Sequence, residues 1–290
     1  MALTAPICVF SCYARLMAAD PSVLIDRLHI RVSRCGHQDI DQDWNKFKGC
    51  CFPYWTSYIN TSAGASIRLA DGSEHELAPN LVHLIPAWVR YDCVTTRKVQ
   101  HLWALFDIVG IPGSLIRECF PGVRTLPLHG PLLSSSECMR QALTAKAQPT
   151  ASNLFAVKSA LYTTMWELFG NLSKEESKRL FAATAPDSVV APALALIDQR
   201  LSDPVSNFAL ARACGFSEHH FIRLFRRHLG QSPAQYALER RVAEGARLLA
   251  LEEHGIDEIS RLCGFPDRYY FTRVFSRLMG LAPAAYRRMK

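Results

Sequence analysis

Two short segments near the C-terminal end of the chain carry side chains that could read the edges of base pairs. His219, Ile222 and Arg223 stand in the first segment, and Tyr269 and Arg273 stand in the second. An arginine can bond both acceptors of a guanine, and an aliphatic methyl group can contact the methyl group of thymine. Because similar side chains recur at equivalent places, the sequence predicts two surfaces that contact duplex DNA.

The candidate contact residues are the polar, cationic and methyl-bearing side chains on the outer faces of these segments. They are Ser217, His219, His220, Ile222, Arg223, Arg226, Arg227, Arg268, Tyr269, Thr272, Arg273, Ser276 and Arg277. A charged outer face is most often only solvated. The case for recognition therefore depends on the elements that hold these residues.

Those elements belong to an internal repeat. Cys214-Gly215-Phe216 opens the first copy and Cys263-Gly264-Phe265 opens the second, at an offset of 49 residues. The offset becomes 50 after this point because the second turn is one residue longer. A repeat of this length predicts two copies of one supersecondary unit.

Each copy predicts a short helix, a glycine turn and a second helix. Glycine permits the positive φ of the turn, and Ser217 or Asp267 is suited to cap the helix that follows. Phe221 and Phe225 then fall on one helical face, and Gly230 suits the position that ends the helix. This order of elements is a helix-turn-helix.

The segment 233–252 between the copies predicts one continuous helix that begins with proline. Roughly 20 residues of helix span about 30 Å, close to the roughly 34 Å between successive major-groove faces of DNA. The pattern Gly-Phe-Ser…Phe-x-Arg-Leu-Phe-Arg-Arg-x-x-Gly-x-Ser-Pro-x-x-Tyr, followed by Gly-Phe…Phe-x-Arg-Val-Phe, resembles the double helix-turn-helix domain of the AraC/XylS family of bacterial transcriptional regulators. The resemblance covers residues 187–290. It implies binding to double-stranded DNA through two adjacent major grooves, and contact with RNA polymerase if the protein is an activator.

Composition agrees with this interpretation. Residues 187–290 contain 14 Arg and 1 Lys against 11 acidic residues, and the whole chain of 290 residues has a formal net charge of +7. Arginine suits phosphate and base recognition better than lysine. This modest excess fits a protein that binds DNA at specific sites without coating it.

The upstream residues alternate in the way that β-strands do. Strands are expected at 28–32, 55–60, 67–69, 74–77, 81–85 and 99–106, with a hairpin at Asp71-Gly72 and a left-handed Asn80. Short strands at this spacing predict a sandwich or barrel. Tyr-Trp-x-x-Tyr-Ile-Asn at 54–60 and His-Leu-Trp-Ala-Leu-Phe at 101–106 resemble the cupin-like sensor domain of sugar-responsive AraC-type regulators. The expected fold class is therefore α+β.

The pattern becomes helical near Ser134. Ser134-x-x-Glu137 and Ser173-x-x-Glu176 predict capping boxes, and 153–169 has apolar residues at helical spacing. Three regions follow: a cupin-like ligand-sensing domain at 1–133, a helical linker at 134–186 and the DNA-binding domain at 187–290. In the family the linker helices supply a dimer surface, so a homodimer is expected. Packing within one chain is the alternative.

The candidate ligand-binding residues are tryptophans and cationic side chains of the β region: His37, Trp44, Trp55, Trp88, Arg90 and Trp103. A Trp face can stack on the apolar face of a sugar ring, while a cationic side chain bonds its hydroxyl groups. The expected effector is a small molecule, with a sugar as its class. Core packing is the alternative for any one Trp. The competing function is a regulator without a small ligand that acts through dimerisation or a protein partner.

No motif predicts catalysis or a cofactor. A cupin metal site needs about three ligands, whereas His75, His83 and His101 stand apart and no His-x-His occurs. A cupin metalloenzyme is therefore only a remote alternative, and nucleophile-elbow, Walker and dinucleotide motifs are absent. Ten cysteines without a Cys-x-x-Cys pair, no secretory leader and no apolar span predict reduced thiols in a cytoplasmic bacterial protein, associated with the nucleoid when DNA-bound.

Overall fold

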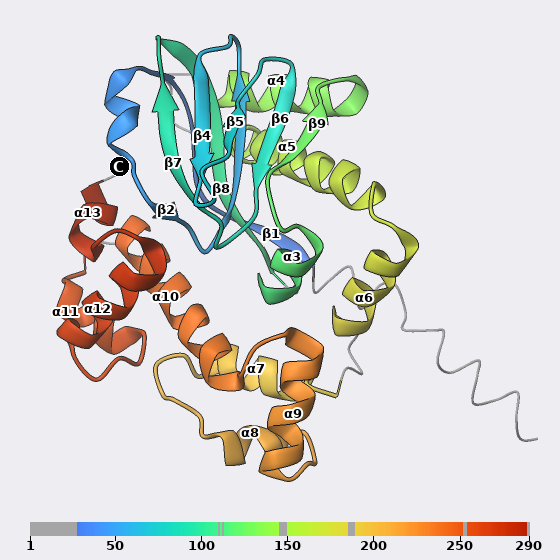
Figure 1. Ribbon diagram of the computed structural model, residues 1–290, viewed down its shortest axis with the longest axis vertical. Helices are drawn as coiled ribbons and strands as arrows, with labels where there is room; N and C mark the ends of the chain where they lie inside the picture. The colour runs from blue at the N-terminus through green and yellow to red at the C-terminus, as the bar shows by residue number, and fades with distance from the viewer. Residues whose placement is uncertain are drawn as a thin grey trace, which may run out of the picture.

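The structure is a computed structural model that describes residues 28–109, 111, 113–144, 150–184, 189–251 and 254–288. Two antiparallel sheets form the N-terminal part, a helix pair packs beside them, and the C-terminal helices lie at one end of the sheets (Figure 1). The chain thus has the expected mixed fold, with a β-rich N-terminal part and a helical C-terminal part. The expected boundary at 186–187 lies outside the described residues.

The larger sheet has the strand order β1-β8-β3-β6-β9. These strands are His29–Ile40, Val99–Val109, Trp55–Asn60, Leu81–Ile85 and Arg124–Pro127. The smaller sheet has the order β2-β7-β4-β5, with strands Cys50–Cys51, Arg90–Thr95, Ala65–Leu69 and Glu74–Glu76. The bounds of β3 and β6 are those expected from the sequence, while β1 is longer because it pairs with β8 from His29 to Ile40.

Both predicted turns are confirmed. Gly72 has a φ of 85° and its N–H donates to the Leu69 carbonyl at 3.0 Å, which closes the hairpin between β4 and β5. Asn80 has a φ of 62° just before β6. Asparagine tolerates this left-handed conformation better than most residues.

The helices between the sheets and the C-terminal part are α3 (Gly113–Cys119), α4 (Gly130–Thr144), α5 (Ala151–Gly170) and α6 (Lys174–Thr184), and a short 3-10 helix, η1 (Gln42–Lys46), precedes β2. The capping box at α6 is confirmed, because Ser173 and Glu176 exchange backbone and side-chain hydrogen bonds at 2.9 and 3.2 Å. The one expected at Ser134 is wrong. The helix begins earlier, at Gly130-Pro131, where proline suits the first turn, and the Ser134 hydroxyl instead donates to the Gly130 carbonyl.

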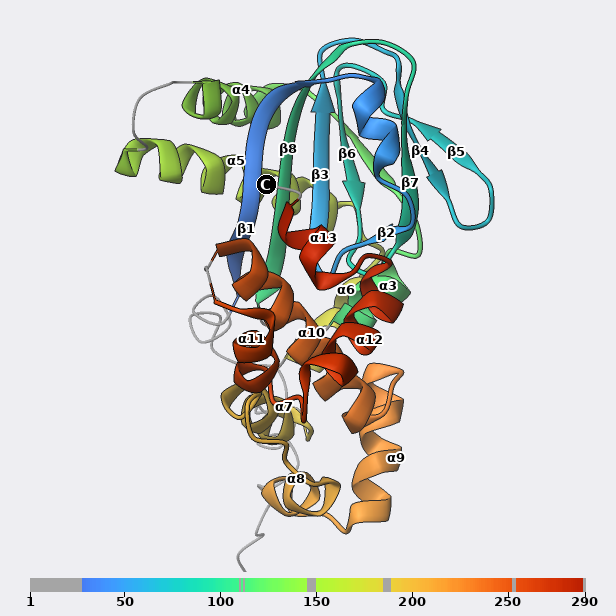
Figure 2. The ribbon, with the colours of Figure 1, turned by 90° about the vertical axis from the view of Figure 1, so that its left-hand side faces the viewer.

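The C-terminal helices are α7 (Ala191–Gln199), α8 (Asn207–Ala213), α9 (Glu218–Leu229), α10 (Pro233–Leu251), α11 (Ile256–Leu262), α12 (Arg268–Met279) and α13 (Pro283–Arg288). The long helix α10 joins the pair α8–α9 to the pair α11–α12 (Figure 2). Glu252, the expected last residue of this helix, lies outside the described residues.

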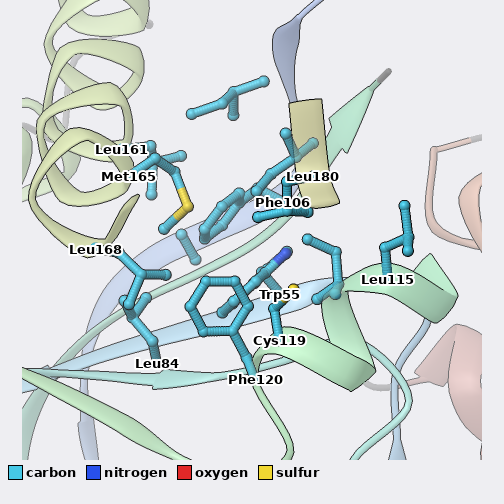
Figure 3. Packing of buried hydrophobic residues seen from close by; sticks show 14 of the residues in the cluster. Trp55, Leu84, Phe106, Leu115, Cys119, Phe120, Leu161, Met165, Leu168 and Leu180 are labelled. Carbon is cyan, nitrogen blue, oxygen red and sulfur yellow. The ribbon is translucent and has the colours of Figure 1, made fainter. Parts of the chain in front are cut away.

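The apolar core consists of two clusters, and each runs from the sheets into the C-terminal helices. One contains Trp55, Phe106 and Phe120 between the larger sheet, α3 and α5 (Figure 3). This cluster continues to Phe221 and Phe225 of α9. The other fills the space between the two sheets and continues to side chains of α12 and α13. The larger sheet is therefore buried on both faces.

Candidate nucleic-acid interface and sensor cavity

The first helix-turn-helix consists of α8, a glycine turn and α9. The Ser206 hydroxyl caps α8 by accepting from the Ala209 N–H at 3.2 Å, and Gly215 has a φ of 74° in the turn. Ser217 is the N-cap residue of α9, although its side chain makes no cap hydrogen bond. Gly230, at a φ of 67°, ends α9 in the left-handed conformation that the sequence predicts.

The second helix-turn-helix repeats this geometry with α11 and α12. Gly264 has a φ of 71° in the turn. The Asp267 carboxylate caps α12 by accepting from the Tyr270 N–H at 2.7 Å, and Gly280 ends the helix at a φ of 76°. The two copies therefore share their turn and C-terminal cap, and differ in how the second helix begins.

The inner faces of α9 and α12 are apolar and buried. Phe221, Phe225 and Leu229 point into the core from α9, and Phe271 and Phe275 do so from α12. Each helix thus has one face held by the core and one face left for a partner.

The candidate DNA-contacting residues lie on or beside the outer faces. Those with exposed side chains are Ser217, His219, Arg223, Arg226, Arg227, Arg268, Tyr269, Arg273 and Arg277. The half-buried ones are His220, Ile222, Thr272 and Ser276. The structure therefore brings each predicted set together on one helix, and its role in binding DNA stays a prediction.

Local contacts orient several of these cations. Arg223 Nη2 lies 3.0 Å from His220 Nδ1, and the Arg273 guanidinium lies over the Tyr270 ring at 5.2 Å. Arg268 pairs with Asp257 of α11 at 3.1 Å. Ion pairs and ring contacts of this kind restrict the rotamers that a long cationic side chain samples.

The spacer helix α10 is closely packed on the second copy. Its 19 residues span about 28 Å at about 1.5 Å per residue. A Cβ on Gly245 would lie 2.9 Å from the Phe271 ring, so α10 and α12 approach to a distance that only glycine allows. Whether the spacing matches two adjacent grooves stays a prediction.

A small cavity of about 90 Å³ lies between the sheets. Trp44, Tyr58, His101 and Trp103 line it from the β-rich part, and Tyr286 of α13 lines it from the C-terminal part. His101 Nδ1 bonds Asn60 Oδ1 at 2.7 Å. Burial lowers the pKa of His101 to about 3, so this imidazole is neutral at physiological pH.

The structure separates the predicted ligand-binding tryptophans. Trp44 and Trp103 line the cavity, whereas Trp55 packs on the opposite face of the larger sheet among Phe106 and Phe120. The reason is strand alternation, since successive side chains of β3 point to opposite faces. Tyr58, three residues after Trp55, faces the cavity instead.

The remaining predicted ligand residues have other contacts. His37 Nδ1 lies 2.8 Å from the Thr144 hydroxyl at the end of α4. The Trp88 carbonyl accepts from the Cys51 thiol. Arg90 donates to the Gly49 carbonyl at 2.8 Å and to the Arg277 carbonyl at 3.3 Å, so it joins the smaller sheet to the end of α12.

Sequence reasoning missed Tyr58, His101 and Tyr286 as cavity residues. The period of two along β3 could have identified Tyr58, because it faces away from Trp55. Tyr286 could not have been found in this way. This residue belongs to α13, so no strand pattern of the β-rich part points to it. Its hydroxyl has no hydrogen-bond partner among the described residues.

Two negative findings concern the residues that the structure describes. Within them, no group of three or more His, Cys, Asp or Glu side chains is arranged to hold a metal ion. Within the same ranges, no helix combines the length and the apolar character needed to cross a membrane.

Comparisons with known proteins match the C-terminal part. The family model described as "Helix-turn-helix domain" matches residues 210–289. The MmsAB operon regulatory protein of Pseudomonas aeruginosa is 35% identical over 78 residues, which are 27% of this chain and 25% of the relative. The transcriptional activator RhaR of Klebsiella pneumoniae is 35% identical over 109 residues, which are 37% of this chain and 38% of that protein. The chain thus spans well under half the length of these curated relatives, which are regulators of transcription and not enzymes.

A solved structure resembles nearly the whole chain. Fatty-acid-bound ToxT of Vibrio cholerae matches with a TM-score of 0.55 at 11% identity, covering 90% of this chain and 94% of ToxT. At this identity the match shows a common fold. The family model and the curated relatives, together with the repeated helix-turn-helix, show that residues 210–289 form a helix-turn-helix domain of the AraC type.

Proposed function

We propose that the chain is a sequence-specific DNA-binding regulator of transcription that contacts duplex DNA through α9 and α12. The observation that carries this proposal is the repeated unit itself. Two helices with the same C-terminal glycine cap and with buried apolar faces expose Arg223 and Arg273 at equivalent positions. Two adjacent major grooves are the proposed target, and the bacterial cytoplasm is where such a target lies.

Replacement of either arginine tests this proposal. Arg223→Ala and Arg273→Ala should each weaken binding by about 1–3 kcal/mol and relax selectivity at one half-site, as expected for loss of a bidentate base contact. The measurement is fluorescence anisotropy of the full chain with a duplex selected from a random pool, and with a scrambled duplex. Arg140→Ala on α4 removes the same charge far from both helices and serves as the control. Unchanged affinity in both test variants would remove these arginines from the interface.

We further propose that a small molecule binds between the sheets. The aromatic lining of the cavity and the buried Tyr286 hydroxyl support this. Ligand pockets usually have volumes of about 300 Å³ or more, and an open cavity of about 880 Å³ shares Trp44 and Trp103 with this one, so a ligand of that size would occupy both. A sugar is the class that the tryptophans suggest, and the unsaturated fatty acid bound to ToxT makes an apolar acid the second class to examine.

A thermal-shift screen against sugars and unsaturated fatty acids tests this second proposal. A true effector should raise the melting temperature of the full chain, and Cys93→Leu should abolish the rise, because the larger side chain fills the cavity that Cys93 lines. Cys138→Leu makes the same change at an exposed position of α4 and is the control. A rise that persists in Cys93→Leu would place the ligand elsewhere.

The outer face of the helix pair supports a homodimer. Phe155 and Trp166 of α5 are 73% and 66% exposed, and Leu133 of α4 is 51% exposed. Large exposed apolar side chains of this kind mark interaction surfaces. Sedimentation equilibrium should show a dimer that Phe155→Glu and Trp166→Glu convert to a monomer. A dimer that binds the selected duplex with the same affinity in the presence and absence of every compound of the screen would favour the competing function, a regulator that acts through assembly alone.

A further inference from the structure

In the first helix-turn-helix, an aromatic ring stands between the turn and the exposed arginine. The Phe216 ring of the turn packs against the His220 ring, with centroids 5.2 Å apart and planes tilted by 44°. His220 Nδ1 then lies 3.0 Å from Arg223 Nη2. The turn, the ring and the arginine form one continuous chain of contacts.

The second copy has the same chain of contacts with a different ring. The Phe265 ring packs against the Tyr270 ring, with centroids 6.0 Å apart and planes tilted by 51°. The Arg273 guanidinium lies over the Tyr270 ring, 5.2 Å from its centroid. The extra residue in the second turn falls between Phe265 and Tyr270, and the two rings are still in contact.

Helix geometry explains why the ring can reach the arginine. His220 and Tyr270 each precede the arginine by three residues, and residues three apart on a helix are neighbours on one face. His220 is half-buried and Tyr270 is 36% exposed, while both arginines are exposed. Each ring is thus supported on one side by the core and touches an arginine on the other.

We propose that His220 and Tyr270 are positioning residues that hold Arg223 and Arg273 in the rotamers that enter the groove. The inference rests on the proposed DNA binding and assigns a role within it. A free arginine loses rotamer entropy when it is immobilised, and this loss opposes binding. A ring that already restricts the side chain removes part of that cost before DNA arrives, which raises affinity by preorganisation.

The two rings hold their arginines by different chemistry. His220 accepts a hydrogen bond through a ring nitrogen, which requires the neutral imidazole, whereas Tyr270 offers the face of its ring to a cation. Tyr270→Phe should therefore keep the function, because the ring face remains. His220→Phe should lose much of it, because the acceptor is removed.

A double-mutant cycle distinguishes positioning from plain packing. Full-chain variants His220→Ala, Arg223→Ala and their combination are titrated by anisotropy with the pool-selected duplex and with a scrambled duplex. His220→Ala should weaken binding to the selected duplex by about two- to tenfold, the loss expected when one hydrogen bond is removed. In the Arg223→Ala background the same change should cost almost nothing. In the second cycle, Tyr270→Ala should likewise weaken binding only while Arg273 is present. Tyr270→Phe should bind the selected duplex as tightly as the parent chain does.

Additive losses in both cycles would overturn the proposal, since a ring that only packs affects binding whether or not the arginine is present. Equal melting temperatures of the variants, with His228→Ala on α9 as the matched control, exclude unfolding as the cause. If His220→Ala melts early, the Tyr270→Phe and Tyr270→Leu pair carries the test, because these two differ in the ring alone. If Arg223→Ala itself binds the selected duplex normally, the proposed DNA contact fails, and this outcome is distinct from additivity.

Discussion

The two helix-turn-helix copies have nearly the same backbone and very different surroundings. The second copy is seated on the β-rich part: Arg90 donates to carbonyls at the end of α12, and Tyr286 of α13 packs on Phe52 at 6.1 Å. The first copy packs on α7 and α10, and lies farther from the sheets (Figure 1). We therefore call the second copy, α11 and α12, the seated copy because it packs on the β-rich part, and the first copy, α8 and α9, the outlying copy.

The equivalent glycines of the two copies also differ in how closely other residues approach them. A Cβ added at Gly215 or Gly230 of the first copy would meet no atom within 4 Å. A Cβ at Gly264 would collide with the Leu201 carbonyl, and a Cβ at Gly280 would collide with the Gly49 carbonyl. In the first copy, glycine is therefore needed only for its positive φ. In the second copy, the missing side chain also allows a neighbouring backbone carbonyl to approach.

The largest expected effect comes from the C-terminal glycines of α9 and α12. Both have positive φ, so Gly230→Ala should cost about 1 kcal/mol of unfolding free energy for backbone strain alone. Gly280→Ala adds the collision with Gly49, and overpacking typically costs a further ~1–3 kcal/mol. Urea denaturation of the two full-length variants measures the difference. Equal losses would mean that Gly49 and Gly280 do not meet in solution.

Acid should weaken the seated copy through the core that it shares with the β-rich part. His101 has a folded-state pKa of about 3, well below its value of about 6.5 in an unfolded chain. The unfolded chain therefore takes up a proton first, and stability falls as the pH drops from about 6.5 towards 3. Between pH 7 and pH 5 the loss from this one group is about 2 kcal/mol. His101→Gln should remove that part of the slope in chemical denaturation, and an unchanged slope would contradict the buried neutral imidazole.

The contact of Arg90 with α12 should have a smaller effect. Arg90→Ala removes hydrogen bonds from a cation to carbonyls, and partial solvent access limits the loss to about 1–1.5 kcal/mol. Hydrogen exchange should increase in β2, α12 and α13 while α8 and α9 keep their protection. Arg97→Ala is the control, because Arg97 bonds the Ala63 carbonyl within the β-rich part. Faster exchange in both copies would show that the Arg90 contact stabilises the first copy as well as the second.

The smallest difference is expected at the helix N-caps. Asp267 accepts from the Tyr270 N–H, whereas the Ser217 side chain makes no cap hydrogen bond. Asp267→Ala should therefore cost about 1 kcal/mol of stability, and Ser217→Ala only a few tenths of that amount. Thermal melts of the two variants test this order. Equal losses would show that the Ser217 hydroxyl caps α9 in solution.

Local signals in the sequence predicted the helix-turn-helix units well. Gly230 and Gly280, the N-cap at Asp267 and the start of α10 at Pro233 each depend on a few neighbouring residues. The error at Ser134 has the same origin, because a serine followed three residues later by glutamate can also occur inside a helix whose true start is set by Gly130-Pro131.

Long-range contacts could not be predicted. Residue type alone groups Trp55 with Trp44 and Trp103, yet the larger sheet is buried on both faces, and apolar side chains on either face look alike in the sequence. The contacts of Arg90 with Arg277 and of Tyr286 with Phe52 join residues that lie 187 and 234 positions apart. No local pattern specifies which carbonyl or ring such a side chain will meet.

Tyr286 belongs to the helices that complete the second copy and, at the same time, to the wall of the cavity. Tyr286 also packs on Phe275 of α12, with ring centroids 5.6 Å apart, so a small molecule in the cavity and a duplex on α12 would be linked through this one side chain. If filling the cavity changes the affinity for DNA by some factor, thermodynamic linkage requires that DNA change the affinity for the occupant by the same factor. A titration of the effector in the presence and absence of duplex would thus measure the regulatory strength of the protein without any assay of transcription.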